Sequence, residues 1–230
     1  MIKGLQKTTL VDYPGKIACT IFLAGCNFKC GYCYNSDLVF DTGKVPTIPD
    51  EELIEFLESR KNILEGVCIT GGEPTLDKGL VTLIKKIKKL GYCVKLDTNG
   101  SNPEVIKELL EERLVDYIAM DIKASLDSYD EVTSVKVNKQ NIKRSIEIIK
   151  NSQIEYEFRT TAIPDIINEN EIKKILELIK GSKKYFIQQF KPDGKTIDSK
   201  YNSMEALPKE KLNSFKEISS DYVEEAGVRA

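Results

Sequence analysis

The stretch IACTIFLAGCNFKCGYCYN, residues 17–35, decides the fold, because a strand-like run of branched and apolar residues leads directly into three cysteines. Cys26, Cys30 and Cys33 are closely spaced, and the chain contains no histidine that could join them. The six cysteines are too few for a disulfide scaffold in a chain of 230 residues, and these three are too close together to pair comfortably. The cysteine content therefore predicts a protein of a reducing compartment, which we take to be the cytoplasm.

Strand-like and helix-like segments alternate along the rest of the chain. Runs rich in branched residues lie at 17–24, 66–70, 92–98, 116–123, 154–163 and 184–190. Amphipathic segments of helical spacing lie at 53–57, 80–90, 103–114, 138–151 and 168–181. Strand followed by helix, repeated, predicts an α/β fold of parallel strands, either a barrel or an open sheet. Ligands of such folds bind at the carboxyl ends of the strands.

Length and charge restrict the number of domains and the kinds of partner that we expect for this protein. With 41% hydrophobic residues, the chain can bury a full core, so we expect one domain over residues 1–230. Its core would span about 15–192, with a surface loop at 191–206 near the site mouth and a helical segment at about 205–227. The 34 basic and 36 acidic residues nearly cancel, which predicts no nucleic-acid or membrane partner.

The apolar run at 17–24 could also be read as part of a secretory leader. Asp12 and Pro14 precede it where such a leader would be basic. No stretch approaches the roughly 20 apolar residues of a membrane span. We therefore expect a soluble, unprocessed protein.

The three cysteines leave two kinds of metal site open. Thiolates hold iron–sulfur clusters and structural zinc, but structural zinc normally needs four protein ligands. A fourth would have to come from Cys19, Cys68 or Cys93, which lie in or beside predicted strands and are expected to act as small buried apolar residues. Three thiolates on a four-iron cluster leave one iron open to a substrate or cofactor. A zinc-binding interaction module remains the non-enzymatic alternative.

A second motif, TGGEPTL at residues 70–76, follows the second predicted strand. Gly71 and Gly72 allow a backbone to approach a ligand, and Pro74 fixes the turn after Glu73. Backbone carbonyls and the Glu73 carboxylate could then hold an ammonium group. An isolated GGEP could equally be an ordinary turn between strand and helix.

Together, the spacing CxxxCxxC after a strand and the GGEP motif resemble the radical S-adenosylmethionine (SAM) superfamily. Tyr32, the aromatic residue before the last cysteine, strengthens the resemblance and is expected to contact the cofactor. It implies a partial (β/α)6 barrel, similar to an incomplete TIM barrel, with one [4Fe-4S] cluster and SAM as cofactors. The residues it assigns are Cys26, Cys30 and Cys33 to the cluster, and Gly71, Gly72 and Glu73 to the methionine amino group of SAM.

Further stretches resemble the activating enzymes of glycyl radical proteins, namely TTLVDYPGK (8–16), LDTNGS (96–101) and MDIKAS (120–125). The group most similar is that of the activators of anaerobic ribonucleoside-triphosphate reductase and pyruvate formate-lyase. Phe190 or Lys191 stands where the formate-lyase activator has a histidine that contacts SAM. The cofactor contacts implied are Lys123 to the SAM carboxylate, and Asp97, Thr98 and Asp121 against the cofactor, with a monovalent cation as an option.

Three charged residues near the predicted strand ends can also be interpreted from their chemistry alone. Asp97 and Asp121 could cap the helices that follow them instead of contacting a cofactor. Arg159, in FRTTAIP of the fifth predicted strand, is one of few arginines and could bind a carboxylate bidentately. We therefore include Arg159 among the residues expected to bind the cofactor.

The resemblance also implies a reaction and partners. A cluster reduced by a flavodoxin or ferredoxin would cleave SAM to methionine and an adenosyl radical, which would take hydrogen from a glycine of a partner enzyme. No catalytic side chain beyond the cluster and SAM is required. The enzymatic alternative is a radical SAM enzyme acting on a small molecule, similar to the 7-carboxy-7-deazaguanine synthases, against which the VDYPG segment argues.

Overall fold

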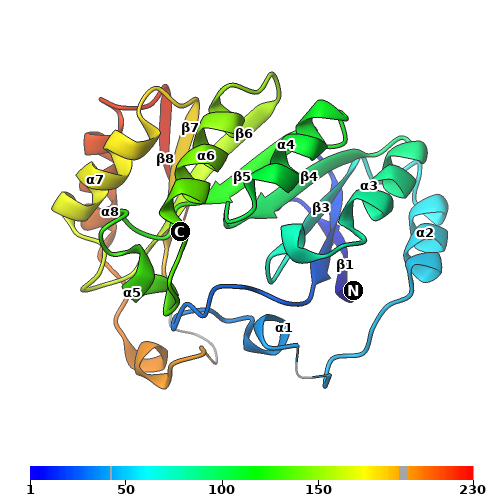
Figure 1. The fold of residues 1–230 in the computed structure, drawn as a ribbon, viewed down its shortest axis with the longest axis horizontal. Helices are drawn as coiled ribbons and strands as arrows, with labels where there is room; N and C mark the ends of the chain where they lie inside the picture. The colour runs from blue at the N-terminus through cyan, green and yellow to red at the C-terminus, as the bar shows by residue number, and fades with distance from the viewer. Residues whose placement is uncertain (42, 192–195, 230) are drawn as a thin grey trace.

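The computed structural model describes residues 1–41, 43–191 and 196–229, and its centre is one curved sheet of eight strands in the order β1 to β8 (Figure 1). β1 is antiparallel to β2, and every later pair is parallel. The strands are β1 (Ile2–Thr9), β2 (Ala18–Leu23), β3 (Gly66–Gly71), β4 (Cys93–Thr98), β5 (Tyr117–Asp121), β6 (Glu155–Ala162), β7 (Lys184–Gln189) and β8 (Glu225–Arg229).

The six predicted strands correspond to β2 through β7, each within two residues of its predicted ends. Their parallel order confirms the predicted partial α/β barrel. Among the described residues no pairing joins β1 to β8, so the sheet curls without closing.

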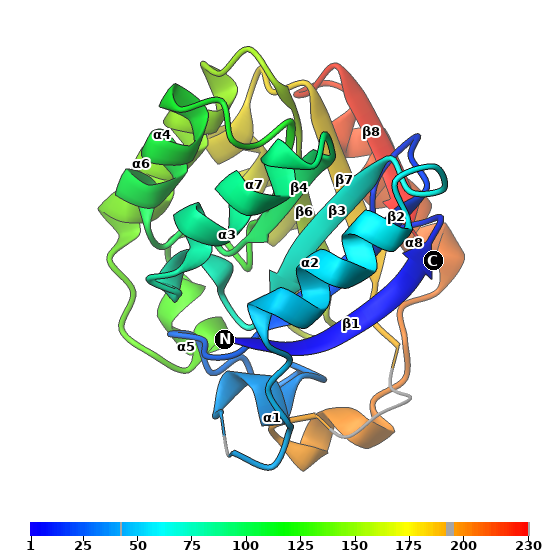
Figure 2. The ribbon, with the colours of Figure 1, turned by 90° about the vertical axis from the view of Figure 1, so that its right-hand side faces the viewer.

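Helices cover the outer face of this sheet, as Figures 1 and 2 show. On α3, for example, Leu83, Ile84 and Ile87 are buried while lysines occupy the last turn, as an amphipathic helix on a sheet requires. The α-helices are α1 (Ser36–Val39), α2 (Asp50–Ser59), α3 (Leu80–Lys89), α4 (Pro103–Glu111), α5 (Tyr129–Thr133), α6 (Lys139–Lys150), α7 (Glu169–Ile179) and α8 (Lys209–Ser219). Two 3-10 turns are η1 (Pro74–Leu76) and η2 (Ser199–Ser203).

The predicted C-terminal helical segment at 205–227 is only partly helical. Helix α8 ends at Ser219, and the chain then returns to the sheet as β8. Strand β8 is parallel to β7 and lies at the edge of the sheet, where its residues are mostly half-buried. An edge strand of this kind carries no continuous apolar run, which is why the hydrophobic pattern did not predict it.

Tyr13 closes the amino-terminal end of the curved sheet. Its ring is 3% exposed and lies 6.0 Å from the ring of Tyr117, centroid to centroid. Gly66 leaves room for it, because a Cβ there would come within 2.9 Å of the Tyr13 ring. The interior of the sheet is therefore open toward the carboxyl ends of the strands.

Within the described part of the chain, no helix is both long enough and apolar enough to cross a membrane.

Candidate active site

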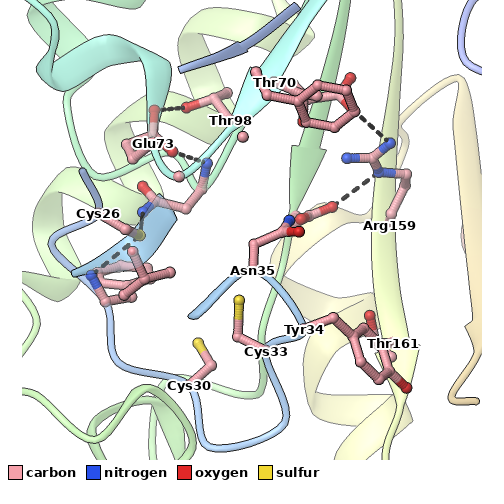
Figure 3. Close-up of a pocket in the computed structure, with 18 of the residues that line it drawn as sticks. Cys26, Cys30, Cys33, Tyr34, Asn35, Thr70, Glu73, Thr98, Arg159 and Thr161 are labelled. Atoms are coloured by element: carbon pink, nitrogen blue, oxygen red, sulfur yellow. Dashed lines mark hydrogen bonds and ion pairs between the residues drawn. The ribbon is translucent and has the colours of Figure 1, made fainter. Parts of the chain in front are cut away.

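A cavity of about 440 Å³ lies at the carboxyl ends of the parallel strands, inside the curve of the sheet. Its walls come from strands β1 to β7 and from the loop that follows β2. All twelve residues that the sequence predicted for the site line it: Cys26, Cys30, Cys33, Tyr32, Gly71, Gly72, Glu73, Asp97, Thr98, Asp121, Lys123 and Arg159. Figure 3 shows the sulfur atoms of Cys30 and Cys33 pointing into the open centre, with Cys26 on the side of Glu73.

The cysteine loop, residues 26–33, is held from within and by the ends of helices α1 and α5. The Lys29 ammonium donates to the carbonyl oxygens of Cys26 and Val39 at 3.0 and 3.2 Å. The backbone N–H of Lys29 donates to the carbonyl oxygen of Thr133 at 2.8 Å. These bonds satisfy backbone groups that a loop would otherwise leave to water, so they fix the course of the chain between the thiols.

A second segment, residues 196–203, packs over the cysteine loop, and we call it the strap. Two of its backbone N–H groups donate to the carbonyl oxygens of Gly31 and Cys33, at 2.8 and 3.1 Å. Tyr201 lies so close that a Cβ on Gly31 would come within 2.7 Å of its ring. The surface loop predicted at the site mouth thus includes this contact, while residues 192–195 of that prediction lie outside the described residues.

Burial makes free thiolates unfavourable at this site. It raises the pKa of Cys26 to about 11 and also raises the pKa of Cys30 above its usual value. The positive charge of Lys123 acts in the opposite direction on both thiols. A bound cationic centre would supply the missing compensation, because metal coordination deprotonates a thiol.

The two glycines of the GGEP motif bring it against the cysteine loop. A Cβ on Gly71 would lie 2.3 Å from the carbonyl oxygen of Leu23, and one on Gly72 would lie 2.1 Å from that of Gly25. The N–H groups of Gly72 and Glu73 donate to the same two oxygens at 2.8 and 2.7 Å. Glycine is therefore needed at both positions for a structural reason that the sequence did not reveal. It allows the GGEP backbone to approach the backbone at Leu23 and Gly25, as well as a ligand.

The carboxylate of Glu73 joins the ends of β3 and β4. It is 1% exposed and accepts hydrogen bonds from the Thr75 N–H and hydroxyl at 3.1 and 2.6 Å. It also accepts from the Thr98 hydroxyl at 2.7 Å and the Asn99 N–H at 2.6 Å. Burial raises its pKa, although these hydrogen bonds favour the ionised form. The predicted contact of Glu73 with an ammonium group stays a prediction.

Five alternating charges lie side by side along the cavity wall and behind it, and we call them the charge ladder: Lys95, Asp97, Arg159, Asp121 and Lys123. The Arg159 Nε lies 2.8 Å from Asp121 Oδ1, and its Nη1 lies 3.3 Å from Asp97 Oδ2. The Lys123 Nζ lies 3.0 Å from Asp121 Oδ2, and Lys95 pairs with Asp97. Three cations against two carboxylates leave one net positive charge, which favours an anionic ligand group.

Pairing keeps both carboxylates of the ladder ionised. Burial alone would raise their pKa values, but Arg159 and the lysines outweigh it and lower the pKa of both Asp97 and Asp121. The alternative that these residues cap helices is wrong, because Asn102 and Ser128 hold the N-cap positions of α4 and α5.

Among residues 1–41, 43–191 and 196–229, no group of three His, Cys, Asp or Glu side chains is arranged to hold a single metal ion. Around Asp97 and Asp121, where the resemblance offered a monovalent cation, the nearest cations are Arg159 and the two lysines of the ladder.

Sequence reasoning missed three residues of the site. Lys95 is almost fully buried, and its Nζ lies 3.7 Å from the sulfur of Cys68. Cys68 was predicted to be a plain buried residue, yet it lines the cavity. Lys95 could have been identified from the sequence, because it is a lysine within an otherwise largely apolar strand. Asn99 stands within the LDTNGS stretch, which assigned it no role, and its contacts are described below.

Comparison with known proteins shows which families and proteins this chain is similar to. Residues 20–179 match the family described as the Radical SAM superfamily. A Methanocaldococcus jannaschii protein named "Putative glycyl-radical enzyme activating enzyme" is 34% identical over 238 aligned residues, covering 100% of this chain and 95% of the relative. An Archaeoglobus fulgidus 7-carboxy-7-deazaguanine synthase is 27% identical over 168 residues, covering 70% of this chain and 69% of the relative.

Among solved structures, Streptococcus suis SuiB bound to its precursor peptide SuiA is similar in fold. The TM-score is 0.65 at 16% identity, covering 90% of this chain and 48% of SuiB. This chain therefore spans about half of that protein, and the likeness concerns the fold alone.

Proposed function

This chain belongs to the radical SAM superfamily, and from that premise we propose that it is an activating enzyme that generates a glycyl radical on a partner protein. Members of the superfamily use a [4Fe-4S] cluster and SAM. The observation that carries the proposal is the similarity to the M. jannaschii relative over the whole chain, under a name that states this activity. The proposed electron donor is a flavodoxin or ferredoxin, and the proposed compartment is the cytoplasm.

The residues present fit these cofactors. Three thiols line the cavity, and the burial that raises the pKa of Cys26 and Cys30 calls for a positive centre to stabilise the anionic form of these two thiols. Cys26, Cys30 and Cys33 would hold the cluster. Next to these thiols, the GGEP backbone and Lys123 would hold the amino and carboxylate groups of SAM.

When bound, the cluster and SAM supply one-electron chemistry that can remove a hydrogen atom from a carbon. The side chains of the protein position these cofactors and shield them from water. Lys123 has three N–H donors and gives one to Asp121, so two remain for a carboxylate. Arg159 fixes Asp121 from its other oxygen, which keeps the Lys123 ammonium in place. Phe28, Tyr32 and Val39 add a buried apolar wall that excludes water.

Activity on a partner protein is tested by electron paramagnetic resonance. Anaerobically reconstituted protein, reductant and SAM are incubated with candidate glycyl radical enzymes, and a glycyl signal is expected on one of them. Cys30→Ala should lose both the cluster and the signal. Cys68→Ala serves as the matched control for cluster content, because it removes a buried thiol of the same cavity that is not proposed as a ligand. Retention of a full cluster in Cys30→Ala would contradict the ligand assignment.

A radical SAM enzyme acting on a small molecule is the second candidate, favoured by the similarity to the A. fulgidus synthase. Cleavage of SAM without a glycyl signal on any partner, together with formation of a 7-deazaguanine product, would favour it over the activating enzyme.

A further inference from the structure

The side chain of Asn99, on the loop after β4, connects the cysteine loop with the strand ends. It is 5% exposed, and its amide Nδ2 lies 3.9 Å from the sulfur of Cys26 and 3.0 Å from Asn27 Oδ1. The first distance is at the outer limit of an N–H···S hydrogen bond. The sulfur of Cys26 has a second donor, the backbone N–H of Phe28, at 3.4 Å.

Two further bonds fix the orientation of this residue. The N–H of Ser101 donates to Asn99 Oδ1 at 2.9 Å, so the amide nitrogen must face the cysteine loop. The backbone N–H of Asn99 donates to the Glu73 carboxylate at 2.6 Å. Asn99 is therefore held from both ends, and a flip of its amide would break the bonds to Ser101 and Asn27 together.

We propose that Asn99 is a positioning residue that raises the reduction potential of the cluster through its N–H donor to Cys26. Reduction adds negative charge to a centre whose ligands are already thiolates. An N–H group aimed at such a sulfur stabilises the more negative state more strongly, so its loss favours the oxidised state. This inference rests on the proposed function only in taking Cys26 as a cluster ligand.

The test is a redox titration of the reconstituted protein, followed by electron paramagnetic resonance, with no partner protein present. Asn99→Asp keeps the shape and the acceptor for Ser101 but lacks the donor. We expect its potential to fall enough to reduce the ratio of reduced to oxidised cluster about tenfold at a fixed potential, which equals about 59 mV for one electron. Asn99→Ala removes the donor without adding charge, so its reduction potential should also fall, but by less than that of Asn99→Asp.

Ser101→Ala is the matched control. The Ser101 hydroxyl accepts a hydrogen bond from the Asn27 amide at 2.9 Å, whereas its backbone N–H orients Asn99 and is retained. This variant weakens the link between the two loops and leaves the donor to Cys26 intact, so its potential should match that of the unmodified protein.

Several results would overturn the inference. Unchanged potentials in both Asn99 variants would exclude a role of the donor, and an equal shift in Ser101→Ala would attribute the effect to the loop link. Loss of the cluster in both Asn99 variants, with circular dichroism unchanged, would show a purely structural role. If the unmodified protein binds no cluster, the proposed function itself fails, and that outcome is distinct from the others.

Discussion

Arg159→Ala tests whether the charge ladder is a stabilising part of the fold. The guanidinium is 11% exposed and bridges Asp97 and Asp121, with which it makes hydrogen bonds of 3.3 and 2.8 Å. The substitution removes a buried cation and both of these bonds. We expect the metal-free protein to lose stability, because two partly buried carboxylates each lose one of their two cationic partners.

The magnitude follows from the remaining contacts. Hydrogen bonds to charged groups contribute about 1.5–3 kcal/mol each, so two give about 3–6 kcal/mol. Asp97 keeps Lys95 and Asp121 keeps Lys123, and removal of the arginine also removes its own desolvation penalty. We therefore expect a net loss of about 3 kcal/mol, which for a chain of this size lowers the melting temperature by about 6–12 °C.

The assay is urea unfolding of the metal-free protein followed by circular dichroism, with thermal melting as a second measurement. Arg159→Lys is the matched control, because it keeps the positive charge but loses the branched guanidinium that reaches both carboxylates. Its unfolding free energy should lie between those of the unmodified protein and Arg159→Ala. An Arg159→Ala protein within about 0.5 kcal/mol of the unmodified chain, a change typical of a neutral surface substitution, would refute the reasoning.

Three further predictions concern the site and its support. Lys123→Ala should weaken SAM binding, measured by equilibrium dialysis, while iron content stays unchanged; unaltered affinity would remove Lys123 from the SAM site. Gly72→Ala should reduce both cluster content and SAM binding, because its Cβ would lie 2.1 Å from the Gly25 carbonyl oxygen, and full retention of both would contradict this close approach. Glu157 is fully buried, and although burial raises its pKa, Arg229 lowers it below the usual value near 4.5. The stability that ionised Glu157 contributes is thus present above that pH and is lost as the pH falls further. The difference in unfolding free energy between the unmodified protein and Glu157→Gln should therefore shrink on acidification. A difference that stays constant with pH would argue against a stabilising Glu157–Arg229 ion pair.

The central strands could be predicted because they are buried on both faces. Strand β2 and strand β5 read as continuous branched or apolar runs, which is the pattern of a parallel strand between helices and a packed interior. Strand β1, IKGLQKTT, is half-exposed and carries lysine, glycine and glutamine, while β8, EAGVR, contains a glycine and two charged residues and has no buried residue. Both are edge strands, and their place in the sheet depends on neighbours far away in the sequence.

The site was predictable where it consists of motifs and not where it depends on tertiary contacts. The cysteines and the GGEP turn have a spacing that can be read along the chain. By contrast, Lys95 contacts Cys68 on β3 and Asn99 contacts the cysteine loop. The strap reaches the cysteine loop from more than 150 residues away. No local pattern encodes such contacts.

The central claim is that Cys26, Cys30 and Cys33 leave one iron of the cluster free to bind SAM. The most direct measurement is electron–nuclear double resonance of the reduced protein with SAM that carries an isotope label on its amino nitrogen. We predict magnetic coupling between the cluster and the label. A cluster that shows no coupling to the labelled nitrogen, and whose spectrum is the same with and without SAM, would contradict the account.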